Sequence, residues 1–357
     1  MNLLFYMGHP AHFHLFRNAI RILKEQGHSI KIVIKKKDVL EDLVKNTGWN
    51  YVNINPRGRR DNRLSIAVNF LMRDWELIRI CRKFKPEKLF GTAIEIIHAG
   101  KLLGIPSILL NEDDDHVIPA FAWLGFPYAD VILCPHCCKI GKWEHRKTGY
   151  KGFHELAYLH PKYFQPDPKV GDALKKKASQ YFILRFSSLG AHHDRGRTGI
   201  TDAVAHSLIN LLLPHGNVYI TTERKIPDAL EKFKIKINPS DMHSALYYAS
   251  IYVGDSQTMA AESAVLGTPS IRFNDFTGQI GYLEELEHEY GLTYGFKTTQ
   301  QELMFQKIND LLRVADLKRK MEANRQKLLT DCIDLTENLV NFAAGKPSPG
   351  FQKPTVS

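Results

Sequence analysis

The first half of the chain alternates short apolar runs with stretches whose apolar residues recur at helical spacing. An apolar run over residues 2–7 is followed by Phe13, Phe16 and Ile20 at intervals of three or four, and Gly27 ends the pattern. Further strands are predicted over residues 30–34, 51–54, 88–90, 107–110 and 131–133, and a longer amphipathic helix over 65–84. This alternation predicts a parallel sheet covered by helices on both faces.

The pattern pauses over residues 161–170, which contain three prolines, and then starts again. Later strands are predicted over 181–186, 218–220, 235–237, 251–253 and 270–273, and helices over 201–213, 241–249, 259–266, 279–290, 300–311 and 317–344. We therefore expect an α/β protein with two Rossmann-like domains facing across a cleft. The expected parts are an N-terminal domain (1–165), a C-terminal domain (171–330), a helix that crosses back (331–345) and a flexible tail (346–357).

Composition agrees with a globular two-domain protein, since 44% of the 357 residues are hydrophobic. No stretch approaches the roughly 20 apolar residues of a membrane span, and the short apolar start lacks the basic flank of a signal peptide. The five cysteines are odd in number and irregularly spaced, which favours a reducing compartment. A cytoplasmic location is expected. The single Cys-x-x-Cys at Cys134 and Cys137 is weak support for zinc, and we predict neither metal nor cofactor.

The formal net charge is +10, with basic clusters at residues 35–37 and around Arg57, Arg59, Arg60 and Arg63. These clusters are either solvated loops or a surface that attracts an anionic partner. Signatures of nucleic-acid binding, such as zinc-finger spacing or a helix-turn-helix, are not evident. The charge therefore leaves peripheral contact with an anionic membrane at the inner face of the cell as one hypothesis.

The segment over residues 251–269 reads as a strand, a polar turn, a helix and a Gly-Thr-Pro turn. Ser256, Gln257 and Thr258 fall at the start of the helix, where unpaired N–H groups and the helix dipole favour a diphosphate. Glu262 lies about one and a half turns further on and suits ribose hydroxyls. The alternative is an ordinary turn in which Asp255 caps the helix and Glu262 lies on a solvated face.

This segment resembles the donor site of GT-B glycosyltransferases and of UDP-N-acetylglucosamine 2-epimerase. In those proteins an Asp-Ser turn binds the diphosphate and a Glu six residues after the Ser binds the ribose. Ser256 and Glu262 keep that spacing. The epimerase has Gly-Gly after the Ser, where this chain has Gln257-Thr258. The resemblance implies that Asp255 and these four residues bind a nucleotide sugar.

A second resemblance covers nearly the whole chain, from Met1 to about Leu311. It rests on Gly8-His9-Pro10-Ala11-His12-Phe13-His14, on residues 254–260 and on Leu266-Gly267-Thr268-Pro269. These motifs resemble a domain-of-unknown-function family of bacteria and archaea for which a GT-B-like fold is expected.

Three histidines, His9, His12 and His14, crowd the turn after the first strand, beside Gly8. A histidine at this edge suits the base that deprotonates an acceptor in inverting transfer. We predict His12 first and His9 second as catalytic, with Gly8 at the nucleotide-sugar site and His14 structural. Helix capping and packing are the alternative for each.

Asn111-Glu112-Asp113-Asp114-Asp115 follows an apolar strand and should face the same edge. These acids are predicted to orient an acceptor, pair with His12 or hold a cation, or else to form a solvated loop. Glu112 is near an acid/base position of the 2-epimerases, so we include it as catalytic. The acid that the epimerases have after the preceding strand is replaced here by Gly91-Thr92-Ala93.

Two further turns complete the predicted donor site. Arg185 and the turn after it, with His192 and His193, suit phosphate binding. Thr222 is predicted to lie near the base or the sugar. The alternative for Thr222-Glu223-Arg224 is a surface turn with a Glu-Arg ion pair.

The leading functional hypothesis is a GT-B glycosyltransferase, a hexosyl- or N-acetylhexosaminyltransferase, that uses a nucleotide sugar, with UDP the first choice. The expected acceptor is a glycan or a lipid-linked sugar in surface polysaccharide biosynthesis. The alternatives are an enzyme like UDP-N-acetylglucosamine 2-epimerase and a non-catalytic GT-B-like binding protein.

Overall fold

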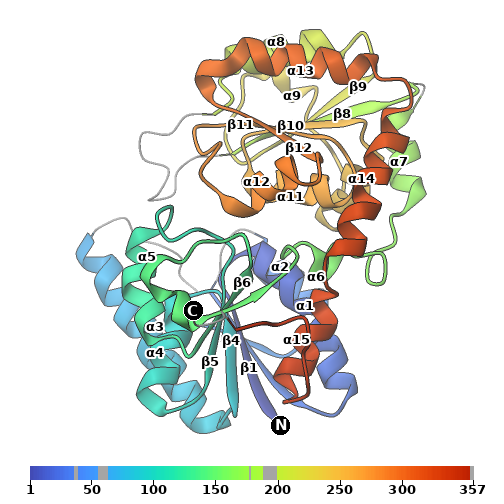
Figure 1. The fold of residues 1–357 in the computed structure, drawn as a ribbon. Helices are drawn as coiled ribbons and strands as arrows, with labels where there is room; N and C mark the ends of the chain where they lie inside the picture. The colour runs from blue at the N-terminus through green and yellow to red at the C-terminus, as the bar shows by residue number, and fades with distance from the viewer. Residues whose placement is uncertain (36–38, 55–62, 177, 188–198, 354–357) are drawn as a thin grey trace. The chain divides into compact units, whose positions relative to one another are not determined.

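The computed structural model describes residues 1–35, 39–54, 63–176, 178–187 and 199–353, with only the backbone of 63–70. The chain forms two compact units, the first comprising Met1–Tyr163 with Cys332–Ser357, and the second Phe164–Asp331 (Figure 1). The first connection between the units falls inside the proline-rich segment 161–170. Within the described ranges, no helix is long and apolar enough to cross a bilayer.

The first unit is built on a parallel seven-stranded sheet of order β3-β2-β1-β4-β5-β6-β7. Its strands are β1 (Asn2–Met7), β2 (Ser29–Ile34), β3 (Tyr51–Asn53), β4 (Lys88–Gly91), β5 (Ser107–Leu110), β6 (Val131–Pro135) and β7 (Lys147–Tyr150). Its helices are α1 (Pro10–Glu25), α2 (Leu40–Lys45), α3 (Arg63–Phe84), α4 (Ile94–Leu103), α5 (Pro119–Gly125), α6 (Leu156–Leu159) and α15 (Leu335–Ala343), with 3-10 turns η1 (Phe126–Tyr128) and η2 (Gly141–Arg146).

Strand β1 is an interior strand of this sheet, and its run of apolar residues agrees with that position. Every side chain from Leu3 to Met7 is fully buried, as expected for a strand with helices on both of its faces. Helices α1 and α15 cover one face, and α3, α4 and α5 cover the other (Figure 1). Phe16 of α1 packs edge-on against Phe5 of β1 at 5.4 Å, and Gly27 ends the helical region with φ +82°.

The second unit has a parallel five-stranded sheet of order β12-β11-β10-β8-β9. Its strands are β8 (Tyr181–Phe186), β9 (Asn217–Thr222), β10 (Ile251–Gly254), β11 (Ser270–Phe273) and β12 (Thr293–Phe296). Its helices are α7 (Pro168–Lys175), α8 (Asp202–Leu212), α9 (Asp228–Glu231), α10 (Met242–Tyr248), α11 (Gln257–Val265), α12 (Gly281–His288), α13 (Gln301–Arg313) and α14 (Leu317–Asp331), with 3-10 turns η4 (Pro239–Asp241) and η5 (Thr298–Gln300).

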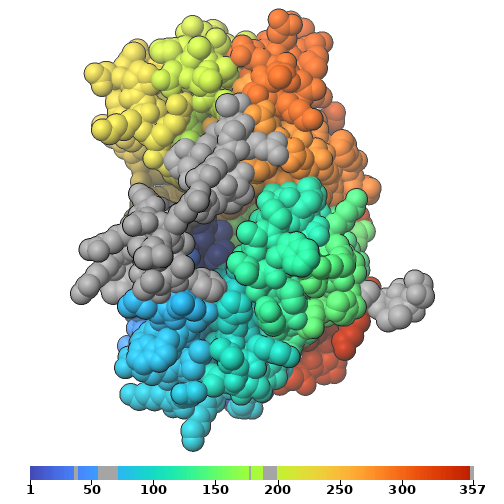
Figure 2. All heavy atoms as spheres, turned by 90° about the vertical axis from the view of Figure 1, so that its left-hand side faces the viewer, coloured from blue at the N-terminus to red at the C-terminus, as the bar shows by residue number. Residues whose placement is uncertain are grey.

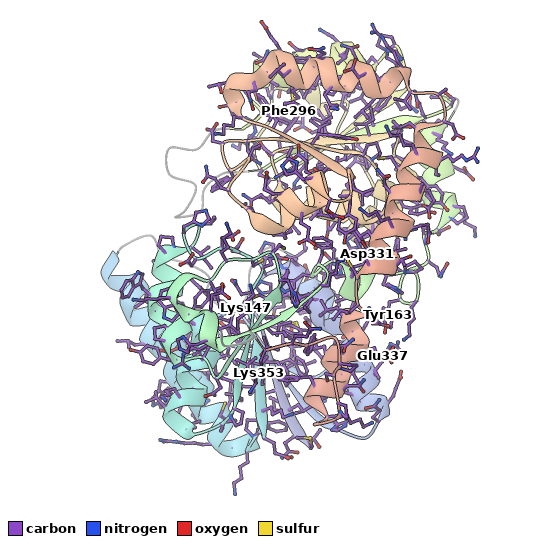
Figure 3. All side chains as sticks on the ribbon, viewed as in Figure 1. Lys147, Tyr163, Phe296, Asp331, Glu337 and Lys353 are labelled. Atoms are coloured by element: carbon purple, nitrogen blue, oxygen red, sulfur yellow. The ribbon has the colours of Figure 1, made fainter. Side chains whose placement is uncertain are left out.

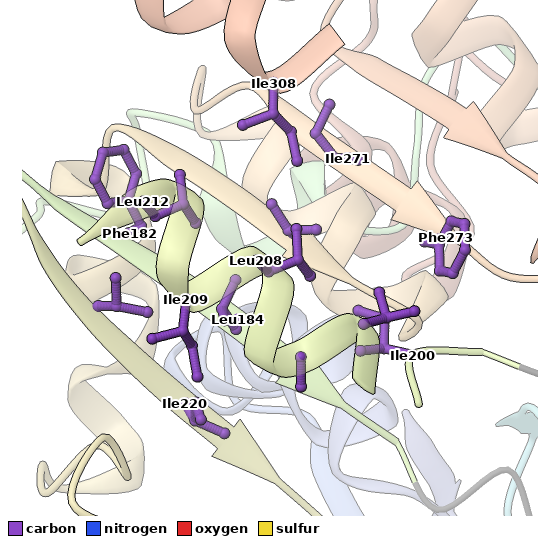
Figure 4. Packing of buried hydrophobic residues seen from close by; sticks show 14 of the residues in the cluster. Phe182, Leu184, Ile200, Leu208, Ile209, Leu212, Ile220, Ile271, Phe273 and Ile308 are labelled. Atoms are coloured by element: carbon purple, nitrogen blue, oxygen red, sulfur yellow. The ribbon is translucent and has the colours of Figure 1, made fainter. Parts of the chain in front are cut away.

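The core of the second unit lies between its sheet and two amphipathic helices. Leu208 of α8 and Ile308 of α13 pack with Phe182 and Ile271 of the sheet (Figure 4). The prediction of an α/β fold with two parallel, helix-covered sheets is therefore confirmed.

Three local predictions differ from the structure. Residues 235–237 do not form a strand, because Lys234 makes only a single bridge to Ile220 at the edge of the sheet. Strands β7 and β12 were not predicted, since each is four residues long and contains a glycine. The helix expected over 317–344 is two helices, α14 and α15, and the second begins where the side chain of Asp334 caps it.

The predicted flexible tail is ordered as far as Lys353. Gln352 exchanges two backbone hydrogen bonds with Gly149 of the edge strand β7, at 2.7 and 2.9 Å. The Phe351 ring packs near Tyr150 and Phe342, with ring centres 5.8 and 5.6 Å apart. The tail is ordered because β7 is an edge strand, whose free backbone N–H and C=O groups form hydrogen bonds with the tail. Residues 354–357 lie outside the described part of the chain.

Each sheet reverses its strand order at one point, between β1 and β4 in the first unit and between β8 and β10 in the second. Ligands of open parallel sheets bind at the carboxyl ends of the strands beside such a point. Gly8 and Thr92 follow β1 and β4, while Ser187 and Asp255 follow β8 and β10. A ligand is therefore expected to bind at these two edges.

Candidate functional site

The first edge to consider is the start of α11 in the second unit. Ser256 is the N-cap, and its hydroxyl accepts a hydrogen bond from the Met259 N–H at 3.4 Å. Gln257 and Thr258 are the first helical residues and are partly exposed. Their N–H groups have no acceptor inside the helix and lie at the positive end of its dipole. This helix start is therefore able to bind an anion.

Asp255 is buried and holds together the two ends of the segment between β8 and α8. Its Oδ1 accepts a hydrogen bond from the Ser187 N–H at 2.6 Å, and its Oδ2 accepts one from the Ile200 N–H at 3.2 Å. Burial raises the pKa of Asp255, and these two N–H groups oppose the rise. The alternative in which Asp255 caps the helix is wrong, because Ser256 does so. The Asp255 carboxylate instead binds the N–H groups of Ser187 and Ile200.

Glu262 of α11 is only 6% exposed, which excludes the alternative that it lies on a solvated face. Its Oε1 lies 3.1 Å from Nε2 of His243, a buried residue of α10. The His243 ring in turn packs edge-on against Phe164, with ring centres 6.1 Å apart. Sequence reasoning missed His243, although it is a histidine near the start of the predicted helix over 241–249, just before the motif strand.

Arg185 and Thr222 are both engaged by the end of β9. Arg185 donates a hydrogen bond from Nη1 to the Thr221 hydroxyl at 3.0 Å, and its Nη2 forms an ion pair with Glu223. The Thr222 hydroxyl accepts from the Arg224 N–H at 3.1 Å and donates to the Arg224 carbonyl at 2.9 Å. These contacts hold the guanidinium at the carboxyl edge of the sheet, next to the end of β10.

The surface-turn alternative for residues 222–224 is also corrected. Glu223 pairs with Arg185 rather than with its neighbour Arg224, whose Nη2 lies 3.2 Å from Asp202 and donates to the Ile200 carbonyl at 2.7 Å. His192 and His193, predicted at this site, lie outside the described residues. The described part of this edge therefore combines a helix start, a paired arginine and a buried carboxylate.

The corresponding edge of the first unit contains the histidine turn. His9 is the N-cap of α1 and accepts a hydrogen bond from the Ala11 N–H at 3.2 Å through Nδ1. His12 accepts a hydrogen bond from the Gly8 N–H at 3.2 Å, also through Nδ1. His14 packs against the rings of Phe13 and Tyr158, with ring centres 5.4 and 5.3 Å apart. His9 thus has the capping role, and His14 packs as predicted.

Thr92 is a residue of this edge that sequence reasoning did not select. Its Oγ1 lies 2.6 Å from Nδ1 of His12, at the point where β1 and β4 end. The signal in the sequence was indirect, since Gly91-Thr92-Ala93 stands where the epimerases have an acid. In this structure a hydroxyl contacts His12.

The contact with Gly8 selects a tautomer of His12. Because an N–H can only donate, Nδ1 carries the lone pair, and a neutral ring then has its proton on Nε2. In this tautomer Nε2 is a hydrogen-bond donor, suited to a hydroxyl or phosphate oxygen. Base action at Nε2 requires the other tautomer, in which Nδ1–H donates to Thr92 and the Gly8 contact is lost.

The acidic loop after β5 is not simply a solvated loop. Asp114 is buried, and its Oδ1 accepts a hydrogen bond from the Lys139 N–H at 2.8 Å. Glu112 Oε2 lies 3.0 Å from Nδ1 of His154. Burial, with the added repulsion of Glu112, raises the pKa of Asp113 to about 7, although His154 opposes the rise. Asp113 is therefore a titratable group near neutral pH that sequence reasoning did not distinguish from its neighbours.

Comparison with solved structures finds the same fold in proteins of low sequence identity. MnaA of S. aureus, in a structure with UDP, matches with a TM-score of 0.68 and 12% identity over 97% of this chain and 99% of that one. The UDP-GlcNAc 2-epimerase of Neisseria meningitidis, bound to UDP-GlcNAc, gives 0.64 and 12% over 97% and 99%. The glycotransferase of kitacinnamycin gives 0.61 and 12% over 96% and 98%.

These similarities show that the chain has the fold shared by GT-B glycosyltransferases and UDP-GlcNAc 2-epimerases. A search of curated proteins finds no significant match by sequence. A family described as "Protein of unknown function (DUF354)" matches residues 3–279, which is most of the chain. The motifs at Gly8–His14, at residues 254–260 and at Leu266–Pro269 all fall within that range, and the protein is a member of this family.

Proposed function

We propose that the protein is a glycosyltransferase that uses a nucleotide sugar, with UDP as the first choice of nucleotide. One observation carries the proposal. The exposed start of α11 has a buried carboxylate, Glu262, about one and a half turns further along the same helix. A helix start suits a diphosphate, and a carboxylate at that depth suits ribose hydroxyls.

The second unit has the groups that would bind the donor. The N–H groups of Gln257 and Thr258 would bind diphosphate oxygens, and Arg185 would add a charge-assisted bond. His243 would hold Glu262 in the orientation that ribose requires. Asp255 would act indirectly, by positioning the turn after β8.

The first unit has groups suited to the transfer itself. In transfer, an acceptor oxygen attacks the anomeric carbon, the bond from that carbon to the diphosphate oxygen breaks, and the acceptor proton passes to a base. His12 and Asp113 are the two groups in this unit that fit proton transfer. Glu112, paired with His154, would position the acidic loop, and His9 would fix the helix that carries His12.

The proposed acceptor is a glycan or a lipid-linked sugar in surface polysaccharide assembly, with a hexosyl or N-acetylhexosaminyl group transferred. The net charge of +10 supports an anionic acceptor or an anionic surface nearby. A cytoplasmic protein in peripheral contact with the inner face of the membrane would meet such acceptors.

An epimerase acting on UDP-N-acetylglucosamine is the second candidate. It is favoured by Asp113, whose pKa of about 7 suits a group that both removes and returns a proton. The similarity in fold to 2-epimerases also favours it. The third candidate is a non-catalytic binding protein, which would bind the nucleotide but catalyse no reaction.

Calorimetric titration with UDP, GDP and UTP tests the donor site. We expect UDP to bind and Glu262→Ala to weaken binding by tenfold or more, because about 1.4 kcal/mol corresponds to tenfold. Glu302→Ala, which removes an exposed carboxylate of α13, is the matched control and should bind as the wild type does. Absence of binding for all three nucleotides, or unchanged binding by Glu262→Ala, would reject the proposal.

Incubation of UDP-N-acetylglucosamine with the protein and no acceptor separates the candidates. An epimerase converts the nucleotide sugar to its 2-epimer under these conditions. A transferase leaves it intact or hydrolyses it slowly, and consumes it when an acceptor extract is added. Binding with neither reaction over a broad panel of sugars and acceptors identifies a binding protein.

A further inference from the structure

Large apolar side chains are unusually exposed on one group of neighbouring helices. Eleven such side chains are exposed in the described part of the chain, and seven of them lie between α3 and η1. Each of the seven is between 45% and 71% exposed. They are Leu71, Met72 and Trp75 of α3, Leu102 of α4, Trp123 and Leu124 of α5, and Tyr128 of η1. We call the surface that carries them the α3–α5 face.

The elements of this face are held together by His98 of α4. Its Nδ1 lies 3.0 Å from Oδ2 of Asp74 on α3, and its Nε2 lies 3.1 Å from the carbonyl of Leu124 on α5. The ring of Tyr128 packs edge-on at 5.8 Å. The helices lie together on one side of the first unit (Figure 1), and Figure 2 shows that side in light blue to green. The exposed apolar side chains therefore belong to one continuous group of elements.

Cations lie directly on the aromatic side chains of this face. The Arg79 guanidinium is 5.7 Å from the centre of the Trp75 ring, and Lys142 Nζ is 3.4 Å from that of Trp123. Beside Trp123 the surface drops into a hollow of about 340 Å³. Its lining includes Lys142 and the second indole, Trp143. Indoles next to Lys or Arg are typical of groups that lie at the boundary between lipid headgroups and acyl chains.

The charges around the apolar side chains are mostly positive. The described part of α3 has four basic and two acidic residues. Asp74 pairs with His98 and Glu76 with Arg79, while Arg73 pairs with Glu95 of α4. The same helices carry exposed cations: Arg82, Lys83 and Lys85 at the end of α3, and Lys101 on α4. These cations are complementary to anionic headgroups.

We propose that the α3–α5 face binds the surface of a lipid bilayer that contains anionic lipids. The alternation of indole, leucine and lysine favours a bilayer over a second copy of the chain, because lysine is depleted at protein interfaces. Shallow insertion of Trp75, Trp123 and Leu124 would bring the lysine and arginine side chains to the headgroups. The basic residues first singled out in the sequence, at 36–37 and 57–60, lie outside the described residues and are not needed.

The proposal does not depend on the donor site, since none of its residues belongs to the second unit. It supplies the proposed glycosyltransferase with a location, because a lipid-linked acceptor is reached from the membrane surface. Lipid binding is measured without nucleotide, and UDP binding without lipid. Failure of one proposal is therefore distinguishable from failure of the other.

Co-sedimentation with vesicles tests the proposal, using phosphatidylcholine alone or mixed with phosphatidylglycerol. We expect the full chain to sediment with the mixed vesicles and far less with phosphatidylcholine alone. Raising the salt from about 0.05 M to about 0.5 M should weaken binding severalfold without abolishing it, because salt screens charges but not apolar contacts.

Two kinds of variant separate the apolar and the charged contributions. Trp75→Ser with Trp123→Ser should reduce binding tenfold or more. Arg82→Glu with Lys83→Glu should reduce binding to the mixed vesicles by roughly fivefold or more per cation, and should hardly change the weak binding to phosphatidylcholine. The matched control is Leu213→Ser with Leu303→Ser, which removes two exposed apolar side chains of the second unit.

The outcomes are decisive because folding is monitored independently. Each variant should keep its melting temperature and its UDP binding, so that lost sedimentation reflects the surface alone. Equal sedimentation of the wild type and of the tryptophan variant would overturn the proposal, as would no sedimentation of the wild type. A dimer by light scattering that the tryptophan variant converts to a monomer, without any lipid binding, would assign the face to a second copy instead.

Discussion

His243 Nε2 lies 3.1 Å from Glu262 Oε1, and both side chains are buried within the second unit. Truncating one partner leaves a buried polar group with one contact fewer. We expect His243→Ala and Glu262→Ala each to lower the free energy of unfolding by about 2–4 kcal/mol.

The double variant shows whether the two residues act on each other. Its loss should be smaller than the sum of the two single losses by about 0.5–3 kcal/mol. Urea unfolding, followed by a probe in the second unit, measures the three differences. Strict additivity would mean that the contact contributes nothing and that His243 does not position Glu262.

The tautomer of His12 is a second testable feature. The Gly8 N–H and the Thr92 hydroxyl both approach Nδ1, so the neutral ring should carry its proton on Nε2. Nitrogen-15 NMR of labelled histidine distinguishes the two tautomers. Thr92→Ser should keep the Nε2–H form, and Thr92→Val should keep it too, because the Gly8 N–H still donates to Nδ1 and an Nδ1–H would have lost its acceptor. A proton found on Nδ1 in the wild type would instead favour His12 as a base that acts through Nε2.

Asp113 predicts a pH-dependent stability. Its folded pKa of about 7 lies above the value of about 3.9 for a solvated Asp, so ionisation costs free energy only in the folded state. The stability that the protonated carboxyl contributes is full below pH 4 and is lost as the pH rises through 7. Asp113→Asn should therefore be more stable than the wild type by about 4 kcal/mol at pH 8, with little difference at pH 4.

Denaturant unfolding at pH 4, 6 and 8 measures this difference for Asp113→Asn. The exposed Asp228 provides the control, since Asp228→Asn should show no change of stability with pH near neutrality. A constant difference between Asp113→Asn and the wild type across this range would show that Asp113 titrates like a solvated acid.

Asp334 and Glu337 both form ion pairs with Lys162, but the Asp334 carboxylate is half-buried and the Glu337 carboxylate is exposed. Lys162 Nζ lies 2.9 Å from Asp334 and 2.7 Å from Glu337, whose side chains are 18% and 56% exposed. Asp334 also accepts from the Tyr163 hydroxyl and caps α15. Tyr163 and Glu337 are labelled in Figure 3. We expect Asp334→Ala to cost about 2–3 kcal/mol and Glu337→Ala less than about 0.5.

The pH dependence of the Asp334 contribution has the opposite sign to that of Asp113. Burial opposes ionisation, but the hydrogen bonds from the Glu337 N–H, Lys162 and Tyr163 outweigh it and lower the pKa of Asp334. The stability is therefore present above pH 4 and is lost as the pH falls through the lower folded value. Thermal melts at pH 3 and pH 7 should show a smaller defect of Asp334→Ala at pH 3.

Alanine substitutions at Gly267 and Gly278 distinguish the cost of backbone strain from the cost of side-chain crowding. Both have a left-handed φ, +81° and +84°, but a Cβ on Gly267 would lie 2.9 Å from Arg325 Cδ, whereas Gly278 has open space. Arg325 also donates to the Val265 carbonyl at the end of α11. Gly278→Ala should cost about 1 kcal/mol and Gly267→Ala about 2–3. Equal losses in chemical unfolding would mean that Arg325 moves aside freely.

Much of the architecture could be read from spacing alone. Burial of side chains repeats along a helix or strand with the period of that element. It therefore leaves a local pattern in the sequence, as in the apolar run Leu3–Met7 and the helical spacing of Phe13, Phe16 and Ile20. Short edge strands such as β12 escaped prediction, because four residues with a glycine carry too little periodicity. The order of the tail near Phe351 escaped it as well, since the partner of the tail lies some 200 residues earlier in β7.

The sequence by itself determined the alternating elements, the helix start at Ser256 and the spacing to Glu262. These follow from contacts between residues close in the chain. Only the tertiary structure decided which side chains meet: Thr92 with His12, His243 with Glu262, and Asp255 with the Ser187 and Ile200 N–H groups. It also decided that seven exposed apolar side chains share the α3–α5 face. The physical reason is that parallel strands bring together segments far apart in the chain, so partners and burial depend on strand order, which local patterns do not encode.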